Sequence, residues 1–366
     1  MKELNSSSVR SIDVAGMIDR VMAMPDHFQQ AWADAQRVRL TLDKKRIQNI
    51  IIAGMGGSAI AGDVVRCATY GSLPVPVHVC RSYRLPFQPT DKTLFITSSY
   101  SGNTEETLSA FNAARRSGAQ IVCVSSGGKL SEFAKADNLP LFKLPEGFPP
   151  RSALAFLVVP LLAVFSHCGW LTSTSSVEPQ NVAEEIAALS SQLRELRKVY
   201  APEAGEETNL AKKIARALYQ KIPLIYAGVE NFEAAASRWK GQFCENGKTL
   251  AFWNVFPELN HNEIVGWGLP GAYDRNFQVI YLRDRDDHER IQRRMDITRK
   301  AIEQTSNPII EAWSQGESRL TRMFSTIFLG DMTSVYLAIL NSVDPTPVTK
   351  IDFLKSELDK LRALRT

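Results

Sequence analysis

The chain has 366 residues, of which 44% are hydrophobic and 22% charged, a composition typical of a globular protein with more than one domain. Its formal net charge of +4 is small for this length and argues against a broad nucleic-acid-binding surface. The cysteines are scattered and form neither a CxxC pair nor a cluster with zinc spacing: Cys67, Cys80, Cys123, Cys168 and Cys244. We therefore expect reduced thiols, no metal site, no nucleic-acid partner and a cytoplasmic location.

No segment is typical of a membrane protein. The N-terminal residues, MKELNSSSVRSIDVAGM, lack the apolar core of a signal peptide. The most apolar run, residues 153–165, is shorter than the roughly 20 residues that a membrane span requires, and Pro160 interrupts it. We expect a buried helix there and no membrane partner.

The first half of the chain alternates between strand-like and helix-like segments. Residues 12–45 have helical periodicity with many polar positions, which predicts one or two surface helices. Runs that are apolar throughout then follow at regular intervals: residues 47–54, 75–80, 93–99, 120–126 and 139–144. Uniformly apolar strands separated by helices are typical of a parallel sheet that is covered on both faces.

A second pattern of the same kind begins after a break. Residues 172–177 are rich in Ser and Thr and indicate a connection, and a long polar helix follows at residues 182–200. Strand-like runs return later, and the chain ends in an amphipathic helix over residues 351–364. These second-half strands are predicted at residues 221–228, 249–256 and 277–284.

The predicted fold class is α/β, with two doubly wound α/β/α domains that contain parallel sheets. A helical segment precedes the domains and a helix follows them. The predicted boundaries are residues 1–45 for the N-terminal helical segment, 46–168 for the first domain, 169–205 for a linker and long helix, and 206–366 for the second domain.

A glycine-rich turn, AGMGGSAIAGD, follows the first predicted strand. If a helix begins near Ser58, its free N–H groups favour an anion such as phosphate. The spacing of Gly54, Gly56 and Ala59 also matches a loose dinucleotide fingerprint, but the acidic residue that this fingerprint needs is absent from HVCRSYRLP, which contains two arginines. A phosphosugar cradle, an NADP site and a plain structural turn all remain open at this point.

The segment TSSYSGNTEETL follows another predicted strand and is rich in hydroxyls. In a doubly wound sheet, ligands bind at the carboxyl ends of strands where the strand order reverses. The strands at residues 47–54 and 93–99 are both predicted to end at that edge. One hydroxyl there is expected to cap the helix that begins at Asn103 or Thr104. The remaining hydroxyls exceed what a cap requires and match the oxygens of a phosphate. The expected phosphate-binding residues are Gly57, Ser58, Ser99, Ser101 and Thr104.

Six motifs in order resemble one known family. GMGGSAIAGD and SYSGNTEET are similar to the sugar isomerase (SIS) domain. PPRSALAFL, SRWKGQFCENGK, FPELNHNEIVGW and DPTPVTKIDFLKSEL narrow the resemblance to the bifunctional phosphoglucose/phosphomannose isomerases. The resemblance runs from about residue 45 to the C-terminus. It implies two SIS domains in a homodimer, hexose phosphate substrates, reversible aldose–ketose isomerisation and no cofactor or metal.

The resemblance also implies roles for individual residues. Glu245 matches the base that moves a proton between C1 and C2, with Glu258 and Glu263 as competing carboxylates. His261 matches the group that opens the sugar ring, contributed from the neighbouring subunit. Arg151 matches the cation that stabilises the enediolate.

Lys355 on the C-terminal helix matches a lysine that acts at the ring oxygen or the substrate hydroxyls, and Lys350 is an alternative. The other histidines are expected to be structural or exposed, and His27 is placed in a polar surface segment.

Two further functions stay open from sequence. A non-catalytic SIS regulator would keep the phosphate loops and would need no base, whereas Glu245, His261 and Arg151 occur together here. An amino-sugar isomerase or deaminase would need nitrogen-handling groups that the sequence does not reveal. The absence of a basic recognition helix in residues 1–45 counts against a DNA-binding regulator.

Overall fold

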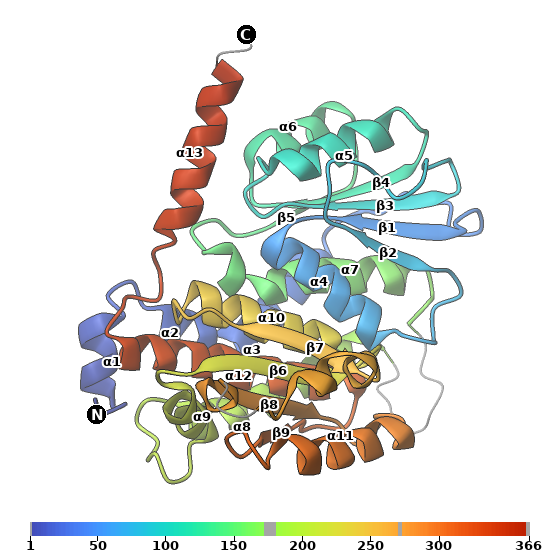
Figure 1. Ribbon diagram of the computed structural model, residues 1–366. Coiled ribbons are helices and arrows are strands. Elements are labelled where there is room, and N and C mark those ends of the chain that lie inside the picture. Colours follow the sequence, from blue (N-terminus) through green and yellow to red (C-terminus); the bar gives the residue numbers. More distant parts are fainter. Residues whose placement is uncertain (1, 172–180, 270–272, 364–366) are drawn as a thin grey trace.

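The computed structural model describes residues 2–171, 181–269 and 273–363 and contains a parallel sheet in each half of the chain (Figure 1). The first sheet has the order β2-β1-β3-β4-β5 and the second the order β7-β6-β8-β9. The strands are β1 (Asn49–Ala53), β2 (Val77–Cys80), β3 (Thr93–Ser98), β4 (Gln120–Ser125), β5 (Leu141–Lys143), β6 (Ile222–Gly228), β7 (Phe252–Phe256), β8 (Phe277–Arg283) and β9 (Ile310–Trp313). The predicted α/β fold class and every predicted strand are confirmed, whereas β9 was not predicted.

Both faces of each sheet are covered, as the uniformly apolar strands predict. In β1, Ile50 and Ile52 face the core between the two sheets, while Ile51 and Ala53 face the opposite side. On that outer side the first sheet carries α5 (Glu105–Arg115) and α6 (Gly128–Ala136). The second sheet carries α11 (Glu289–Ile302) on its outer side.

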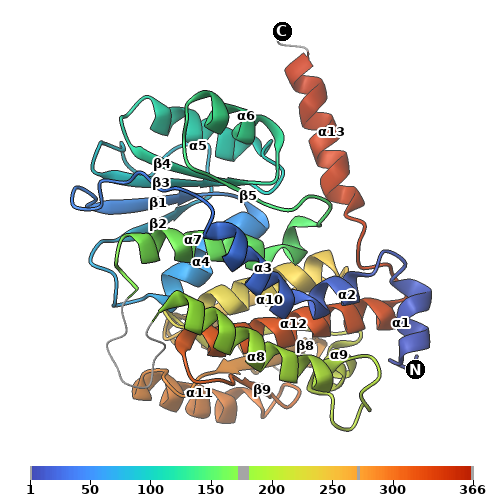
Figure 2. The ribbon, with the colours of Figure 1, turned by 180° about the vertical axis from the view of Figure 1, so that it is seen from behind.

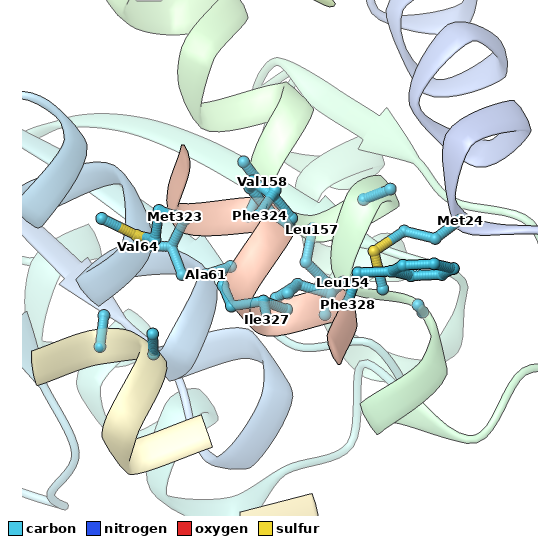
Figure 3. Packing of buried hydrophobic residues seen from close by; sticks show 14 of the residues in the cluster. Met24, Ala61, Val64, Leu154, Leu157, Val158, Met323, Phe324, Ile327 and Phe328 are labelled. Atoms are coloured by element: carbon cyan, nitrogen blue, oxygen red, sulfur yellow. The ribbon is translucent and has the colours of Figure 1, made fainter. Parts of the chain in front are cut away.

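The space between the sheets is filled by helices from both halves of the chain. These are α4 (Gly56–Ala68), α7 (Leu154–His167), α10 (Glu233–Glu245) and α12 (Arg319–Asn341). In Figure 3, Ile327 of α12 lies near Ala61 of α4, and Phe324 of α12 lies near Leu157 and Val158 of α7. A single apolar cluster therefore joins the two α/β units, which fixes the position of one relative to the other.

Two apolar helices lie in this core. α7 is the buried helix that the sequence predicts at residues 153–165, and all but its last residues are buried. Among the described residues α12 is also long and apolar enough to cross a bilayer, but its apolar window is entirely buried within the protein. α12 is therefore accounted for as a core helix.

Residues 12–45 contain two helices, as predicted, but these helices are not confined to the surface, and a further helix precedes them. The N-terminal helices are α1 (Ser6–Ile12), α2 (Met17–Met22) and α3 (Met24–Ala35), drawn in blue in Figure 2. Each of them buries apolar side chains. Phe28 is fully buried and meets the ring of Phe324 edge-on. His27, expected on the surface, is buried between Phe148 and Phe156, so that expectation was wrong. The polar residues of this segment therefore lie on one face of these helices, and the opposite, apolar face packs into the central core.

The remaining helices flank the second unit and end the chain. α8 (Val182–Tyr200) and α9 (Leu210–Leu218) pack on α12, and α8 also contacts α3. The predicted C-terminal helix is α13 (Thr349–Ala363), which projects from the body in both views (Figures 1 and 2). The predicted connection at residues 172–177 lies outside the described residues, and the proposed domain boundaries stay predictions.

Candidate active site

The two predicted ligand loops meet at one edge of the first sheet. β1 lies between β2 and β3. The connection after β1 leads to β2 on one side, and the connection after β3 leads to β4 on the other side, so the strand order reverses between β1 and β3. The register pairs Ala53 with Thr97, which places the carboxyl ends of both strands side by side. This is the crevice in which open α/β sheets bind ligands.

The hydroxyls after β3 are drawn into a compact turn. Ser99 Oγ donates to Thr104 Oγ1 at 2.9 Å and accepts from the Gly102 amide at 3.1 Å. Thr104 stands at the N-cap position of α5, but its side chain makes no capping hydrogen bond. The predicted hydroxyl cap is therefore not formed, and Thr104 keeps its own hydrogen to donate. Ser101 is exposed at the same turn.

Close packing at two glycines holds the loops in place. Gly102 has a φ of +70°, and a Cβ there would lie 1.8 Å from the Gly127 carbonyl oxygen. Gly57 lies in the first turn of α4, where a Cβ would meet the Pro150 carbonyl oxygen at 2.8 Å. The helix begins at Gly56, two residues before the predicted start, and the N-cap Met55 offers no side-chain hydrogen bond. First-turn N–H groups are thus left for an anionic ligand.

Tyr100, which sequence reasoning overlooked, ties the two loops to the next part of the site. Its backbone N–H donates to the buried Ser58 hydroxyl at 3.3 Å. Its phenol donates to the Pro145 carbonyl at 2.7 Å and accepts from the Phe148 amide at 2.9 Å. The position of Tyr100 between serines could have indicated this role, because a tyrosine ring tends to be buried while its hydroxyl usually forms a hydrogen bond.

Arg151 is buried beside these loops and does not start a solvent-exposed helix. It lies in η1 (Pro150–Ser152) and is only 5% exposed. Its Nη2 donates to the carbonyls of Pro345 and Thr346 at 2.8 and 2.7 Å. Its Nη1 lies 3.6 Å from Glu245 Oε2. Burial lowers the pKa of Arg151 from its usual value, and the nearby Glu245 carboxylate opposes that shift.

Glu245 ends α10 and is the carboxylate that faces Arg151, with a side chain 35% exposed. The two competing carboxylates are engaged elsewhere. Glu263 accepts hydrogen bonds from Tyr226 and Asn254, and Glu258 accepts one from Asn262. The geometry therefore favours Glu245 as the group that can work with Arg151.

Lys248 is a second cation of the site that the sequence did not single out. Its Nζ donates to the Glu245 carbonyl and, at 3.0 Å, to the same Pro345 carbonyl that Arg151 binds. Burial and the neighbouring Arg151 charge lower the pKa of Lys248. It links the C-terminal end of α10, where Glu245 lies, to the segment before α13.

The structure does not bring His261 to Glu245 within one chain. β6 and β7 are parallel, so α10 runs back across the sheet and leaves Glu245 at the end where β7 begins. His261 is exposed in η2 (Glu258–His261), after the end of β7. The five residues of β7 alone span roughly 17 Å.

Lys355 and Lys350 are both exposed on α13. This helix starts at Thr349, three positions after the carbonyl of Thr346 that Arg151 holds, and then projects from the body. The structure therefore anchors the start of α13 at the site but leaves its lysines in solvent.

One of the two arginines available to the alternative nucleotide site is already engaged. Arg81 forms an ion pair with Asp63. At the corresponding end of β6 in the second sheet, an acidic side chain takes the place next to the glycine: a Cβ at Gly228 would lie 2.6 Å from Asp287 Oδ1, and a carboxylate there disfavours an anion. Anion-binding features therefore concentrate at the first crevice.

Comparisons with known proteins agree with this arrangement. A family model described as the bacterial phospho-glucose isomerase C-terminal SIS domain matches residues 207–358. A bifunctional phosphoglucose/phosphomannose isomerase from Caldicellulosiruptor bescii is 43% identical over 94% of this chain and all of its own length. One from Aquifex aeolicus is 34% identical over 91% of this chain and 95% of its own. A hypothetical protein from Thermus thermophilus has a similar fold, with a TM-score of 0.71 at 17% identity, covering 95% of this chain and 91% of that chain.

Proposed function

The chain belongs to the family of bifunctional phosphoglucose/phosphomannose isomerases, and we propose from this that it interconverts glucose 6-phosphate and mannose 6-phosphate with fructose 6-phosphate. It is an isomerase of sugar phosphates built on the SIS fold. The proposed reaction opens the sugar ring and moves one proton between C1 and C2 through a cis-enediolate. No metal is assigned to any step.

Phosphate binding, proton transfer and charge stabilisation are each assigned to residues of one chain, whereas ring opening is assigned to His261 of a second copy. The phosphate is held by Gly57, Ser58, Ser99, Ser101 and Thr104 at the edge of the first sheet. Glu245 takes the proton from one carbon and returns it to the other, as a carboxylate in a partly buried site can do. Arg151 stabilises the negative charge that develops on the enediolate oxygens, and its burial strengthens that interaction.

One observation carries the proposal: the Nη1 of buried Arg151 lies 3.6 Å from Glu245 Oε2, next to the turn at Gly57. A regulator that only binds a phosphosugar needs the turn but not a carboxylate and a guanidinium held against each other. The pair supplies both a base and an anion-stabilising group within reach of one carbon framework.

A homodimer completes the proposed site. His261 and Glu245 lie at opposite ends of β7, so a histidine that acts with Glu245 has to come from a second copy of the chain. Large apolar side chains are exposed at both ends of this region: Leu250, Phe252 and Trp253 at the start of β7, and Val265 and Leu269 in the segment that follows His261. Exposed apolar side chains of this size are typical of a subunit contact.

A coupled assay tests the reaction. Fructose 6-phosphate formation is followed from glucose 6-phosphate and from mannose 6-phosphate, with and without EDTA, for the wild type and Glu245→Gln. Glu258→Gln is the matched control, since its carboxylate is bound within its own loop. We expect both sugars to turn over with EDTA present and only Glu245→Gln to lose activity. Tight fructose 6-phosphate binding without any turnover by the wild type would favour a phosphosugar sensor.

Mixing two inactive variants tests the dimer. Glu245→Gln and His261→Asn chains, refolded together, form mixed dimers in which one of the two sites has both wild-type groups. About a quarter of the wild-type activity should return if the site is shared between subunits. No recovery from the mixture, with each parent inactive and dimeric, would place both groups in the same chain.

A further inference from the structure

The guanidinium of Arg151 has only one of its nitrogens free for a substrate. Nη2 is saturated by the Pro345 and Thr346 carbonyls. Nε donates to Asn246 Oδ1 at 2.6 Å. A guanidinium has five N–H donors, so the two on Nη1 are those left over, and Nη1 is the nitrogen that faces Glu245.

Asn246 is held in turn by a helix of the second unit. It directly follows Glu245 and is fully buried. Its Nδ2 donates to Ser334 Oγ at 2.9 Å, and Ser334 lies on α12. Because both the oxygen and the nitrogen of the amide have partners, the side chain cannot rotate without losing one of them.

A buried ion pair holds the backbone of the same arginine. Arg238 of α10 makes two hydrogen bonds to Asp331 of α12, from Nε at 3.0 Å and from Nη2 at 2.6 Å. The same Nη2 donates to the Arg151 carbonyl oxygen at 2.8 Å. The side chains of Arg238 and Asp331 are 3% and 1% exposed. Burying such an ion pair adds little to the stability of the fold, so stability alone does not explain why the pair is present.

We propose that Asn246, Arg238 and Asp331 are positioning residues of this isomerase, which fix Arg151 so that Nη1 alone meets the reacting oxygens. This inference rests on the proposed role of Arg151 in the reaction. Arg151 comes from the first half of the chain, whereas all three positioning residues come from the second. The packing of the two units is thereby coupled directly to the geometry of the anion-stabilising group.

Kinetics of single and double variants test the proposal. In Asn246→Ala the phosphate loops are intact but Nε loses its acceptor, so kcat should fall about 10- to 100-fold while KM stays within about threefold. Arg238→Lys keeps a cation for Asp331 but loses the fork that also reaches Arg151, and it should show the same split between kcat and KM. Asn209→Ala is the matched control, because Asn209 is equally buried but caps α9 away from the site.

A double-mutant cycle separates positioning from simple loss of stability. If Asn246 acts through Arg151, adding Asn246→Ala to Arg151→Lys should change kcat by less than about threefold. Full kcat in both Asn246→Ala and Arg238→Lys, with a much lower but measurable kcat in Arg151→Lys, would overturn the positioning role and leave the proposed function standing. Wild-type kcat in Arg151→Lys would instead overturn the role of Arg151 itself. If Asn246→Ala does not fold, Arg238→Lys decides the outcome.

Discussion

Replacing Gly57 by alanine tests the proposed phosphate turn for two properties at once, its contribution to stability and its contribution to activity. Gly57 has a helical backbone, so alanine is sterically allowed by its own dihedrals and should gain up to about 1 kcal/mol in helix propensity. The new Cβ would, however, lie 2.8 Å from the Pro150 carbonyl oxygen, where ordinary contacts begin at 3.4 Å. Something has to move by about 0.6 Å, and the moving atom belongs to the peptide that leads into Arg151.

The gain in helix propensity and the steric overlap with Pro150 change the stability in opposite directions, but only the overlap should change the activity. Overpacking of this kind costs about 1–3 kcal/mol, so the free energy of unfolding should fall by about 0–2 kcal/mol. A shift of several tenths of an ångström between the phosphate turn and Arg151 should lower kcat/KM by on the order of tenfold, because rates depend steeply on such distances.

Urea unfolding and the coupled isomerase assay, run on the same preparations, measure both quantities. Gly241→Ala is the matched control: it lies in α10, and its Cβ would have no atom within 4 Å. It should gain the helix propensity and keep full activity. A Gly57→Ala protein that is stabilised as much as Gly241→Ala and retains its kcat/KM would refute the reasoning.

Three further outcomes are expected. Thr104→Val removes a hydroxyl that accepts from Ser99 but still has its own hydrogen to donate, and it should raise KM for glucose 6-phosphate about tenfold, with a smaller change in kcat, in steady-state assays. Lys355→Ala should lower kcat, whereas Lys350→Ala should not; the reverse pattern in the same assay would exchange their assignments. Burial raises the pKa of Asp287 to about 6, so the folded state binds its proton more tightly than the unfolded state does. Stability should therefore fall by up to about 3 kcal/mol between roughly pH 4 and 6, and Asp287→Asn should flatten that slope in urea titrations.

The sequence was most informative where local chemistry and strand order act together. Apolar runs located the strands, and the hydroxyl-bearing loops that follow two of them meet at one edge of the first sheet, as predicted. The strand β9, by contrast, is missing from the prediction. Its residues IEAW mix polar and apolar positions at the edge of the second sheet, so it lacks the apolar continuity that identified the other strands.

Contacts between residues far apart in the sequence could not be predicted in the same way. Nothing local distinguishes Arg238 from a surface arginine on a polar helix, and its burial depends on Asp331, 93 positions later. The same holds for His27, whose segment MPDHFQQ mixes polar and apolar residues and gives no sign of its partners in space, Phe148 and Phe156. Periodicity reports which face of a helix is apolar, not which distant element covers it.

The placement of Arg151 explains why this reaction would need both α/β units although the phosphate needs only one. The first crevice can hold an anion with its own loops, as phosphosugar-binding folds do. The charge that appears at C1 and C2 during isomerisation lies away from the phosphate and needs a separate, rigid donor. Arg151 leaves the first unit beside Gly57 but is oriented by α10 and α12 of the second, where Glu245 also ends its helix. Any change that separates the two units should therefore abolish turnover before it abolishes phosphosugar binding, and titration of binding and turnover in the same variants would measure that order.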